Sequence, residues 1–305
     1  MHLSRLEKER LMGKKVISYS LWGDGLVYTI GAVANADVAK KYWPGWICRY
    51  YVSPTVPKNV VNDLASKDNT EVVMMQEDMG FLNSLWRFYA ASDPEVDIML
   101  SRDADSRIGP GDNKHDGTGL REKEAVDEWL NSDKDFHIMR DSCQHGQPMA
   151  AGMWGLRNGL FRNMVDMIDD FFKNHEECKD FFGVDQKFLE KVLYAQAVPF
   201  VYSHDDWFIS NFRNEEKHPF PTPRMRGDGW WKEDFPDWHN RWENETPWED
   251  NFFHDENCQP PDCCNVAPCC NKYHDNDYIG QKIQGNGRFE RELQKYSHLV
   301  PEEAR

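Results

Sequence analysis

Short apolar runs alternate with helical patterns along the chain, and this alternation constrains the fold more than any other feature. The runs are rich in Val, Ile and Tyr, which favour strands. Strands are predicted at 16–21, 46–52, 71–75, 96–100, 136–139 and 200–203. Helices are predicted at about 29–42, from Pro57 onward, and at 81–91, 120–130, 161–172 and 185–197. This order is typical of an α/β fold, in which a Rossmann-type mixed sheet is flanked by helices.

The composition limits the classes of molecule that the protein is expected to bind. The 305 residues include 36 basic and 52 acidic side chains, a net charge of −16. A chain this acidic repels phosphate backbones and anionic lipids, so we expect no nucleic-acid partner. No apolar run approaches the ~18 residues of a membrane span, and residues 1–15 lack the apolar core of a signal peptide. We therefore expect a soluble, cytoplasmic protein, in the host cell if the source is a virus.

Two aspartates follow the predicted strand 96–100 directly. Asp103 and Asp105 stand two residues apart, on a segment that begins where that strand ends. Ligands of open α/β sheets bind beyond the carboxyl ends of the strands. Paired carboxylates there can hold Mg²⁺ or Mn²⁺ together with substrate phosphates. A solvated acidic loop is the alternative interpretation of the pair alone.

The run VDIMLSRDADSR at 96–107 resembles the metal-binding segment of GT-A-type, DXD-motif glycosyltransferases, in particular a sugar transferase family of bacteria and large DNA viruses. Other segments that resemble the family follow in the same order. These are YTIGA (28–32), YWPGW (42–46), LWRF (85–88), LREKEAVDEW (120–129), FHIMRD (136–141), GMWG (152–155), DQ (185–186) and YIGQ (278–281). The resemblance covers residues 15–220 and resumes near 278.

The resemblance implies a metal-dependent hexosyl- or pentosyltransferase. Such an enzyme moves a sugar from a nucleoside-diphosphate sugar to a hydroxyl of an acceptor glycan or glycoprotein. Asp103 and Asp105 would bind Mn²⁺ or Mg²⁺, with His204 as a third ligand. A surface turn is the alternative for His204. Whether the sugar's configuration is inverted or retained stays open.

The resemblance also implies substrate-binding and catalytic residues. The candidates for substrate binding are Arg87, Arg102, Arg121, Arg140, Gly152, Trp154 and Gln186. Arginine suits bidentate recognition of oxygens, although each could equally be a solvated charge, and Trp154 could equally be a core residue. The candidate catalytic residues are Asp185, Asp141 and His145. An inverting enzyme needs a base to deprotonate the acceptor hydroxyl, and Asp185 or Asp141 is our choice.

The composition changes near Pro219. Residues 1–223 are expected to form the catalytic domain, 224–276 an irregular Trp/Cys-rich lobe or insertion, and 277–305 a segment that returns to the catalytic domain. The lobe contains Cys258, Cys263, Cys264, Cys269 and Cys270. This cluster has enough ligands for a structural Zn²⁺, but its adjacent cysteines equally suit disulfides or free thiols. The lobe has no counterpart in the family resemblance, and the loop at 109–119 is longer than the family pattern predicts.

Other classes of protein share parts of this pattern. A nucleotidyltransferase would use the same metal-bound carboxylates. A phosphohydrolase with an Asp-X-Asp nucleophile carries the pair after its first strand, and its further motifs are missing from this sequence. A non-catalytic sugar-binding protein of the same fold is the non-enzymatic alternative, against which the intact Asp103 and Asp105 argue.

Overall fold

The computed structural model describes residues 13–109, 121–141, 147–205, 212, 214–221, 225–226, 229–230 and 288–302. Its centre is an eight-stranded sheet with the strand order β3-β2-β1-β4-β6-β5-β7-β8. The strands are β1 (Lys14–Leu21), β2 (Trp46–Val52), β3 (Thr70–Met74), β4 (Val96–Ser101), β5 (Phe136–Arg140), β6 (Trp154–Arg157), β7 (Val201–Asp205) and β8 (Glu216–His218). β6 is antiparallel to β4 and β5, and the other neighbours are parallel. The predicted mixed α/β sheet is confirmed.

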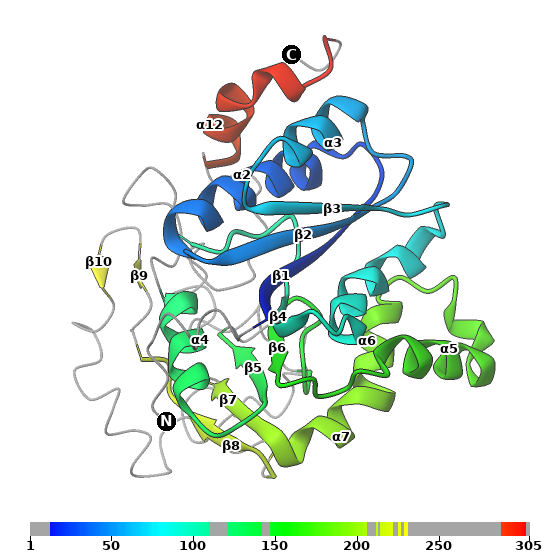
Figure 1. The fold of residues 1–305 in the computed structure, drawn as a ribbon, viewed down its shortest axis with the longest axis vertical. Coiled ribbons are helices and arrows are strands. Elements are labelled where there is room, and N and C mark those ends of the chain that lie inside the picture. Colours follow the sequence, from blue (N-terminus) through cyan, green and yellow to red (C-terminus); the bar gives the residue numbers. More distant parts are fainter. Residues whose placement is uncertain are drawn as a thin grey trace, which may run out of the picture.

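Helices cover both faces of the sheet (Figure 1). One face carries α2 (Leu26–Tyr42), α3 (Lys58–Ala65), α4 (Arg121–Asn131) and α12 (Arg288–Lys295). The other carries the 3₁₀ helix η1 (Gly80–Ser92), α5 (Met164–Asn174) and the continuous run of α6 (Val184–Phe188), the π-helical turn η3 (Leu189–Leu193) and α7 (Tyr194–Ala197). The short elements are η2 (Glu176–Cys178), η4 (Val198–Phe200), η6 (Ser297–Leu299), β9 (Met225–Arg226) and β10 (Gly229–Trp230).

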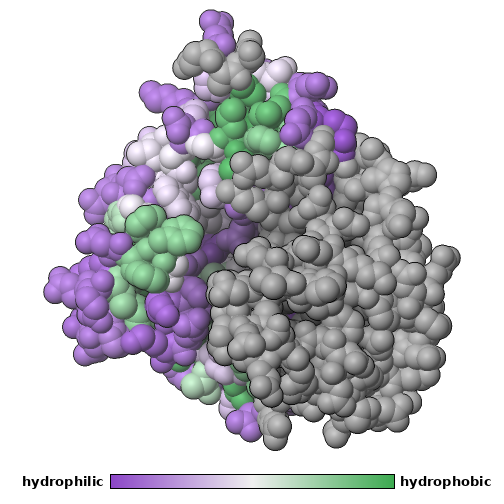
Figure 2. All heavy atoms as spheres, turned by 180° about the vertical axis from the view of Figure 1, so that it is seen from behind, coloured by the Kyte–Doolittle hydropathy of each residue, from purple (hydrophilic) through white to green (hydrophobic). Residues whose placement is uncertain are grey.

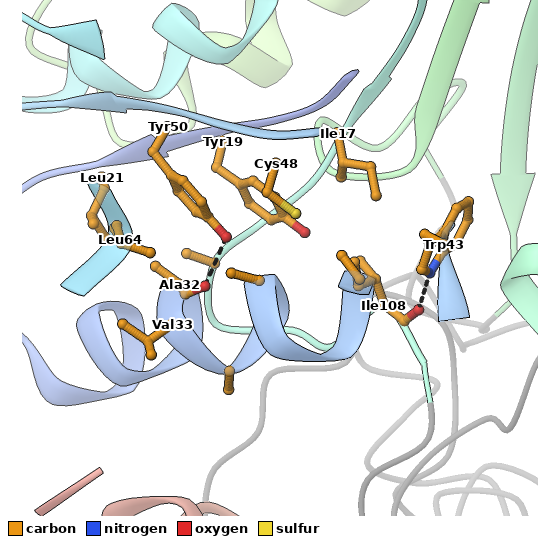
Figure 3. Packing of buried hydrophobic residues seen from close by; sticks show 14 of the residues in the cluster. Ile17, Tyr19, Leu21, Ala32, Val33, Trp43, Cys48, Tyr50, Leu64 and Ile108 are labelled. Atoms are coloured by element: carbon orange, nitrogen blue, oxygen red, sulfur yellow. Dashed lines mark hydrogen bonds between the residues drawn. The ribbon is translucent and has the colours of Figure 1, made fainter. Parts of the chain in front are cut away.

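The alternation of side chains along β1 divides the core in two. Ile17, Tyr19 and Leu21 point to the face that α2 and α3 cover, where the Tyr50 hydroxyl donates to the Ala32 carbonyl at 2.7 Å (Figure 3). Successive strand residues alternate between faces, so Ser18 and Ser20 lie on the side of η1.

The predicted strands and helices fit the structure closely, with three differences. The predicted helix at 81–91 is a 3₁₀ helix over residues 80–92. The residues around Gly152 to Gly155, predicted as a turn, lead into strand β6, and β8 was not predicted. No helix among the described residues is long and apolar enough to cross a membrane.

Candidate active site

The candidate site is built where β4 ends, and the polar face of β1 fixes one of its walls. The Ser18 hydroxyl donates to the Arg87 carbonyl at 2.6 Å, and the Arg87 N–H donates to the Ser20 hydroxyl at 2.9 Å. These two serines of the central strand therefore hold the backbone of η1 at Arg87. The position from which the Arg87 side chain reaches the site is consequently fixed.

Arg87 joins two of the predicted site aspartates. One of its terminal nitrogens, Nη1, forms an ion pair with Asp103 Oδ1, and the other, Nη2, lies 2.5 Å from Asp185 Oδ2. Burial alone lowers the pKa of the guanidinium, but Asp103 and Asp185 outweigh this and raise it. Arg87 is thus a permanent cation between two carboxylates. The carboxylates of Asp103 and Asp185 therefore share one guanidinium.

Gly152 lies directly against the Asp103 carboxylate. A Cβ at this position would come within 2.0 Å of Asp103 Oδ2, so no other residue fits without displacing the carboxylate. The side chain of Gln186 fixes the segment that carries the glycine. Its Oε1 accepts from the Ala151 N–H at 3.1 Å, and its Nε2 donates to the Met149 carbonyl at 2.6 Å. Both polar atoms of the Gln186 side chain thus bond to the backbone beside Gly152, and its predicted role in substrate binding stays a prediction.

Helix α2 holds the segment after Asp103 on its other side. The Asn35 side chain donates to the Ser106 carbonyl at 2.8 Å, and the Trp43 indole donates to the Ile108 carbonyl at 2.6 Å (Figure 3). A Cβ on Gly31 would come within 2.0 Å of the Ala104 carbonyl. The close approach of α2 therefore requires glycine at position 31.

A buried ion pair connects the same segment to the C-terminal helix. Arg107 Nη2 lies 2.5 Å from Glu292 Oε2, and Arg288 Nε lies 3.1 Å from Glu292 Oε1. Arg107 also donates to the Ala104 carbonyl at 3.1 Å. Helix α12, beside α2 in Figure 1, therefore contributes to the order of the Asp103–Asp105 segment.

Two of the predicted substrate-binding arginines are engaged within the protein. Arg102 is 1% exposed, pairs with the buried Glu122, and donates to the Ser101 carbonyl at 2.6 Å. Arg140 is fully buried between Asp205 at 3.0 Å and Glu215 at 2.6 Å. Each guanidinium is neutralised internally, so both have structural roles in this conformation. Substrate binding by these two arginines stays a prediction.

Three other predicted site residues are fully buried. Trp154 stacks on Phe136, with 5.4 Å between ring centroids and 8° between planes, so neither of its faces is offered to a sugar. Asp141 follows β5 and has no exposed surface. His204 lies in β7 with its Nδ1 2.7 Å from Nε2 of His137. Its Nε2 is 3.7 Å from a Glu128 carboxylate oxygen.

The carboxylates just after β4 suit a divalent cation that is bound partly by the protein and partly by the substrate. Asp103 and Asp105 are both partly exposed there. Within the described ranges, no group of three or more His, Cys, Asp or Glu side chains is placed to hold a metal ion, so His204 is not brought together with the aspartates. Mg²⁺ is commonly bound by one or two carboxylates plus substrate phosphates and waters. Two aspartates therefore fit a metal that arrives with a diphosphate.

Asp78 forms a polar cluster at the ends of β2 and β3 that was missed from the sequence. Its carboxylate accepts hydrogen bonds from the hydroxyls of Ser53 and Thr55, both at 2.8 Å, and from the Gly80 N–H and the Asn83 amide, both at 2.9 Å. Partial burial alone would raise the pKa of Asp78, but these donors lower it to about 2. The position of Ser53, one residue after β2, was the available signal.

Several predictions lie outside the described residues. They concern His145, the side chain of Arg121, most of the loop at 109–119, the cysteine cluster at 258–270 and the closing segment at 278–281. The proposed Zn²⁺ therefore stays a prediction, as does most of the lobe at 224–276.

No protein-family model and no curated protein matches the chain. Several solved structures resemble its fold. A glycosyltransferase involved in glycosylation of the major capsid of PBCV-1 is 13% identical, with a TM-score of 0.40 over 64% of this chain and 82% of that one. The galactosyltransferase LgtC, in complex with donor and acceptor sugar analogs, is 10% identical, with a TM-score of 0.42 over 77% and 98%.

A third similar structure is glucosyl-3-phosphoglycerate synthase from Mycobacterium tuberculosis, in complex with Mn²⁺, uridine diphosphate and glucosyl-3-phosphoglycerate. It is 14% identical, with a TM-score of 0.34 over 57% of this chain and 72% of that one. These structural neighbours are glycosyltransferases, as the sequence motifs predict. Similarity this distant carries no conclusion about the activity of this chain.

Proposed function

We propose that the chain is a metal-dependent glycosyltransferase that moves a sugar from a nucleoside-diphosphate sugar to a hydroxyl of a glycan or glycoprotein. The observation that supports this most is the junction at the end of β4. There Arg87 bridges Asp103 and Asp185, and Gly152 gives the Asp103 carboxylate the room that a side chain would fill. The family resemblance of the ordered sequence motifs supports the same function.

Asp103 and Asp105 are the residues that would hold the Mn²⁺ or Mg²⁺. When bound, the metal would neutralise charge on the diphosphate leaving group. Arg87 orients Asp103 for this role and carries positive charge at the site. The carboxylates of Asp103 and Asp185 outnumber the single Arg87 guanidinium that pairs with both, which favours binding of a divalent cation before or with the anionic donor.

We propose an orienting role for Asp185. Its Oδ2 accepts from Arg87, and its Oδ1 accepts from the Gln186 N–H at 2.9 Å. Each oxygen thus accepts one hydrogen bond, and the bond to Arg87 holds its guanidinium in place. Asp141 is buried, so a role for it as the base requires the site to open. Asp185→Asn tests the orienting role, because the amide accepts less strongly from Arg87 and turnover should fall without loss of fold.

The decisive experiment measures nucleotide release. The protein is incubated with Mn²⁺ and a panel of UDP- and GDP-hexoses and UDP-xylose, with and without acceptor glycans. Release of nucleoside diphosphate that is lost with chelator and in Asp105→Ala is expected. Asp170→Ala, on the exposed surface of α5, is the matched control and should keep wild-type release.

Other outcomes would assign or exclude a function. Release of pyrophosphate from a nucleoside triphosphate would identify a nucleotidyltransferase instead. Binding of a nucleotide-sugar without any release would identify a non-catalytic sugar-binding protein. If no nucleotide-sugar binds, the proposed transferase is excluded.

A further inference from the structure

Two phenylalanines on the surface are exposed far more than is usual for this residue. Phe182 is 80% exposed and Phe81 is 44% exposed. Their rings contact each other edge to face, with 5.7 Å between centroids and 82° between planes. Exposed apolar groups that gather on a soluble protein mark surfaces for binding. Met79 and Phe181, next to them in sequence, are exposed as well.

The surroundings of the pair are polar. Figure 2 shows an apolar patch on its left side, where the surface is otherwise hydrophilic; this is the side that carries α5 and α6 in Figure 1. Glu77, Asp78 and Asp180 are exposed acidic residues near the two phenylalanines in sequence, although the Asp78 carboxylate already accepts four hydrogen bonds. The Lys179 side chain, next to Asp180, is 40% exposed and is the basic residue there. Such a rim disfavours anionic lipids and polyanions, while carboxylates accept hydrogen bonds from hydroxyl groups.

The elements that carry the two rings are the same elements that build the candidate active site. Phe81 lies in η1, the helix that delivers Arg87. Phe182 precedes Asp185 by three residues, which extend over at most about 11 Å of chain. Arg87 and Asp185 are in contact, so the two rings are carried by segments that meet at the candidate site.

Two glycines set the direction of the rings. Gly80, directly before Phe81, has a φ of 63°, and Gly183, directly after Phe182, has a φ of 85°. Non-glycine residues rarely adopt this left-handed conformation. The chain therefore turns sharply beside each ring, at a position suited to glycine. These two turns hold the rings at the surface.

We propose that Phe81 and Phe182 form an aromatic platform that binds the neutral acceptor glycan, an assignment that rests on the proposed transferase function. The negative face of an aromatic ring attracts the partly positive C–H groups on the apolar face of a sugar ring. The hydroxyl groups of that sugar reach the acidic rim. The platform lies outside the junction of Arg87 with Asp103, so it holds the molecule that receives the sugar rather than the one that donates it.

The test is retention on an array of neutral oligosaccharides, which needs no donor or turnover. Wild type is expected to bind a subset of the array, and Phe182→Ala and Phe81→Ala to bind that subset at least 10-fold more weakly. Phe182→Trp should keep binding, and Phe182→Leu, apolar but without a ring, should lose it. Phe200→Ala removes a phenylalanine of similar exposure (41%) in η4 and should bind as wild type does.

Because Phe182 is exposed, the effect of its substitution on folding can be measured separately from the effect on glycan binding. Phe182→Ala should keep the wild-type melting temperature to within about 2 °C, since surface changes alter stability little. The platform is overturned if no array glycan binds wild type, or if Phe182→Leu binds as well as wild type. It is equally overturned if Phe182→Ala instead abolishes self-association in sedimentation or binding to phosphatidylcholine vesicles.

The glycan array and the nucleotide-release assay can refute the two proposals independently of each other. If wild type binds glycans but releases no nucleoside diphosphate, the platform stands as a glycan site and the transferase proposal fails. If nucleoside diphosphate is released but glycan binding is indifferent to both rings, only the platform is withdrawn.

Discussion

Arg87 and Asp185 form a buried ion pair of 2.5 Å although 98 residues separate them in sequence. The same guanidinium pairs with Asp103, so one side chain connects η1, the end of β4 and the start of α6. Three segments of the candidate site therefore share one electrostatic junction. The geometry of this junction depends on the planar guanidinium of Arg87, whose two terminal nitrogens bind one carboxylate each.

Replacing Arg87 should separate the effects of charge and shape. Arg87→Met leaves two carboxylates close together without a cation, and we expect nucleotide release to fall about 100-fold or more. Arg87→Lys keeps the charge, but a single ammonium cannot span both carboxylates in the same geometry, so an intermediate loss is expected. Initial rates and far-UV circular dichroism measure activity and fold. Turnover by Arg87→Met close to that of wild type would show that the junction is not needed.

Gly152→Ala should weaken metal binding specifically. The added Cβ would meet Asp103 Oδ2 at 2.0 Å and must push the carboxylate aside. We expect affinity for Mn²⁺ to fall at least about 10-fold, equal to 1.4 kcal/mol. Titration of Mn²⁺ followed by electron paramagnetic resonance measures it.

The control for this substitution is Gly45→Ala. Gly45 has a φ of +81° and nothing within 4 Å of an added Cβ, so its cost is backbone strain of about 1–2 kcal/mol, away from Asp103. The control should lose stability and keep its Mn²⁺ affinity. Equal Mn²⁺ affinities in the two variants would contradict the role given to Gly152.

Glu292→Ala should destabilise the protein strongly. It leaves Arg107, whose side chain is 1% exposed, without its carboxylate partner. Removing one partner of a buried pair costs about 3–5 kcal/mol. Glu290, exposed on the same helix, provides the control, and Glu290→Ala should change stability by less than about 0.5 kcal/mol. Urea unfolding measures both, and similar midpoints for the two variants would contradict the prediction.

The contribution of Asp78 to stability should depend on pH. Its pKa in the folded chain is about 2, below the value of about 3.9 for an unperturbed aspartate. Because the folded pKa is the lower one, the stabilisation is present above about pH 4 and is lost as the pH falls toward 2. The difference in unfolding free energy between wild type and Asp78→Asn should shrink between pH 6 and pH 3. A difference that is constant over this range would be inconsistent with the low pKa.

Much of the sheet could be predicted because its strands are short apolar runs with clear ends. The strand at 46–52 was predicted to the residue, and Asp103 follows β4 as its place after an apolar run implies. β6 was missed because its glycine suggested a turn. In the structure Gly155 packs against β4 instead, where a Cβ would come within 2.6 Å of Leu100 and 2.9 Å of the Met99 carbonyl.

The roles of the charged residues were harder to predict than the fold. Arg102 and Arg140 fit oxygen recognition as well as internal pairing, and only their distant partners Glu122 and Glu215 decide between these. A single sequence carries no mark of which charges will meet across the core. For the same reason, the sequence could not show that Gln186 bonds to the backbone around Gly152.

The ion pair between Arg107 and Glu292 also has a consequence for how the protein is made. Glu292 lies 185 residues after Arg107. At ribosomal rates of about 5–20 residues per second, the arginine waits about 10–40 s for its partner. Until Glu292 is made, the segment of Asp103 and Asp105 lacks this ion pair. The contact that ties the Asp103–Asp105 segment to α12 can therefore form only after 185 further residues have been made.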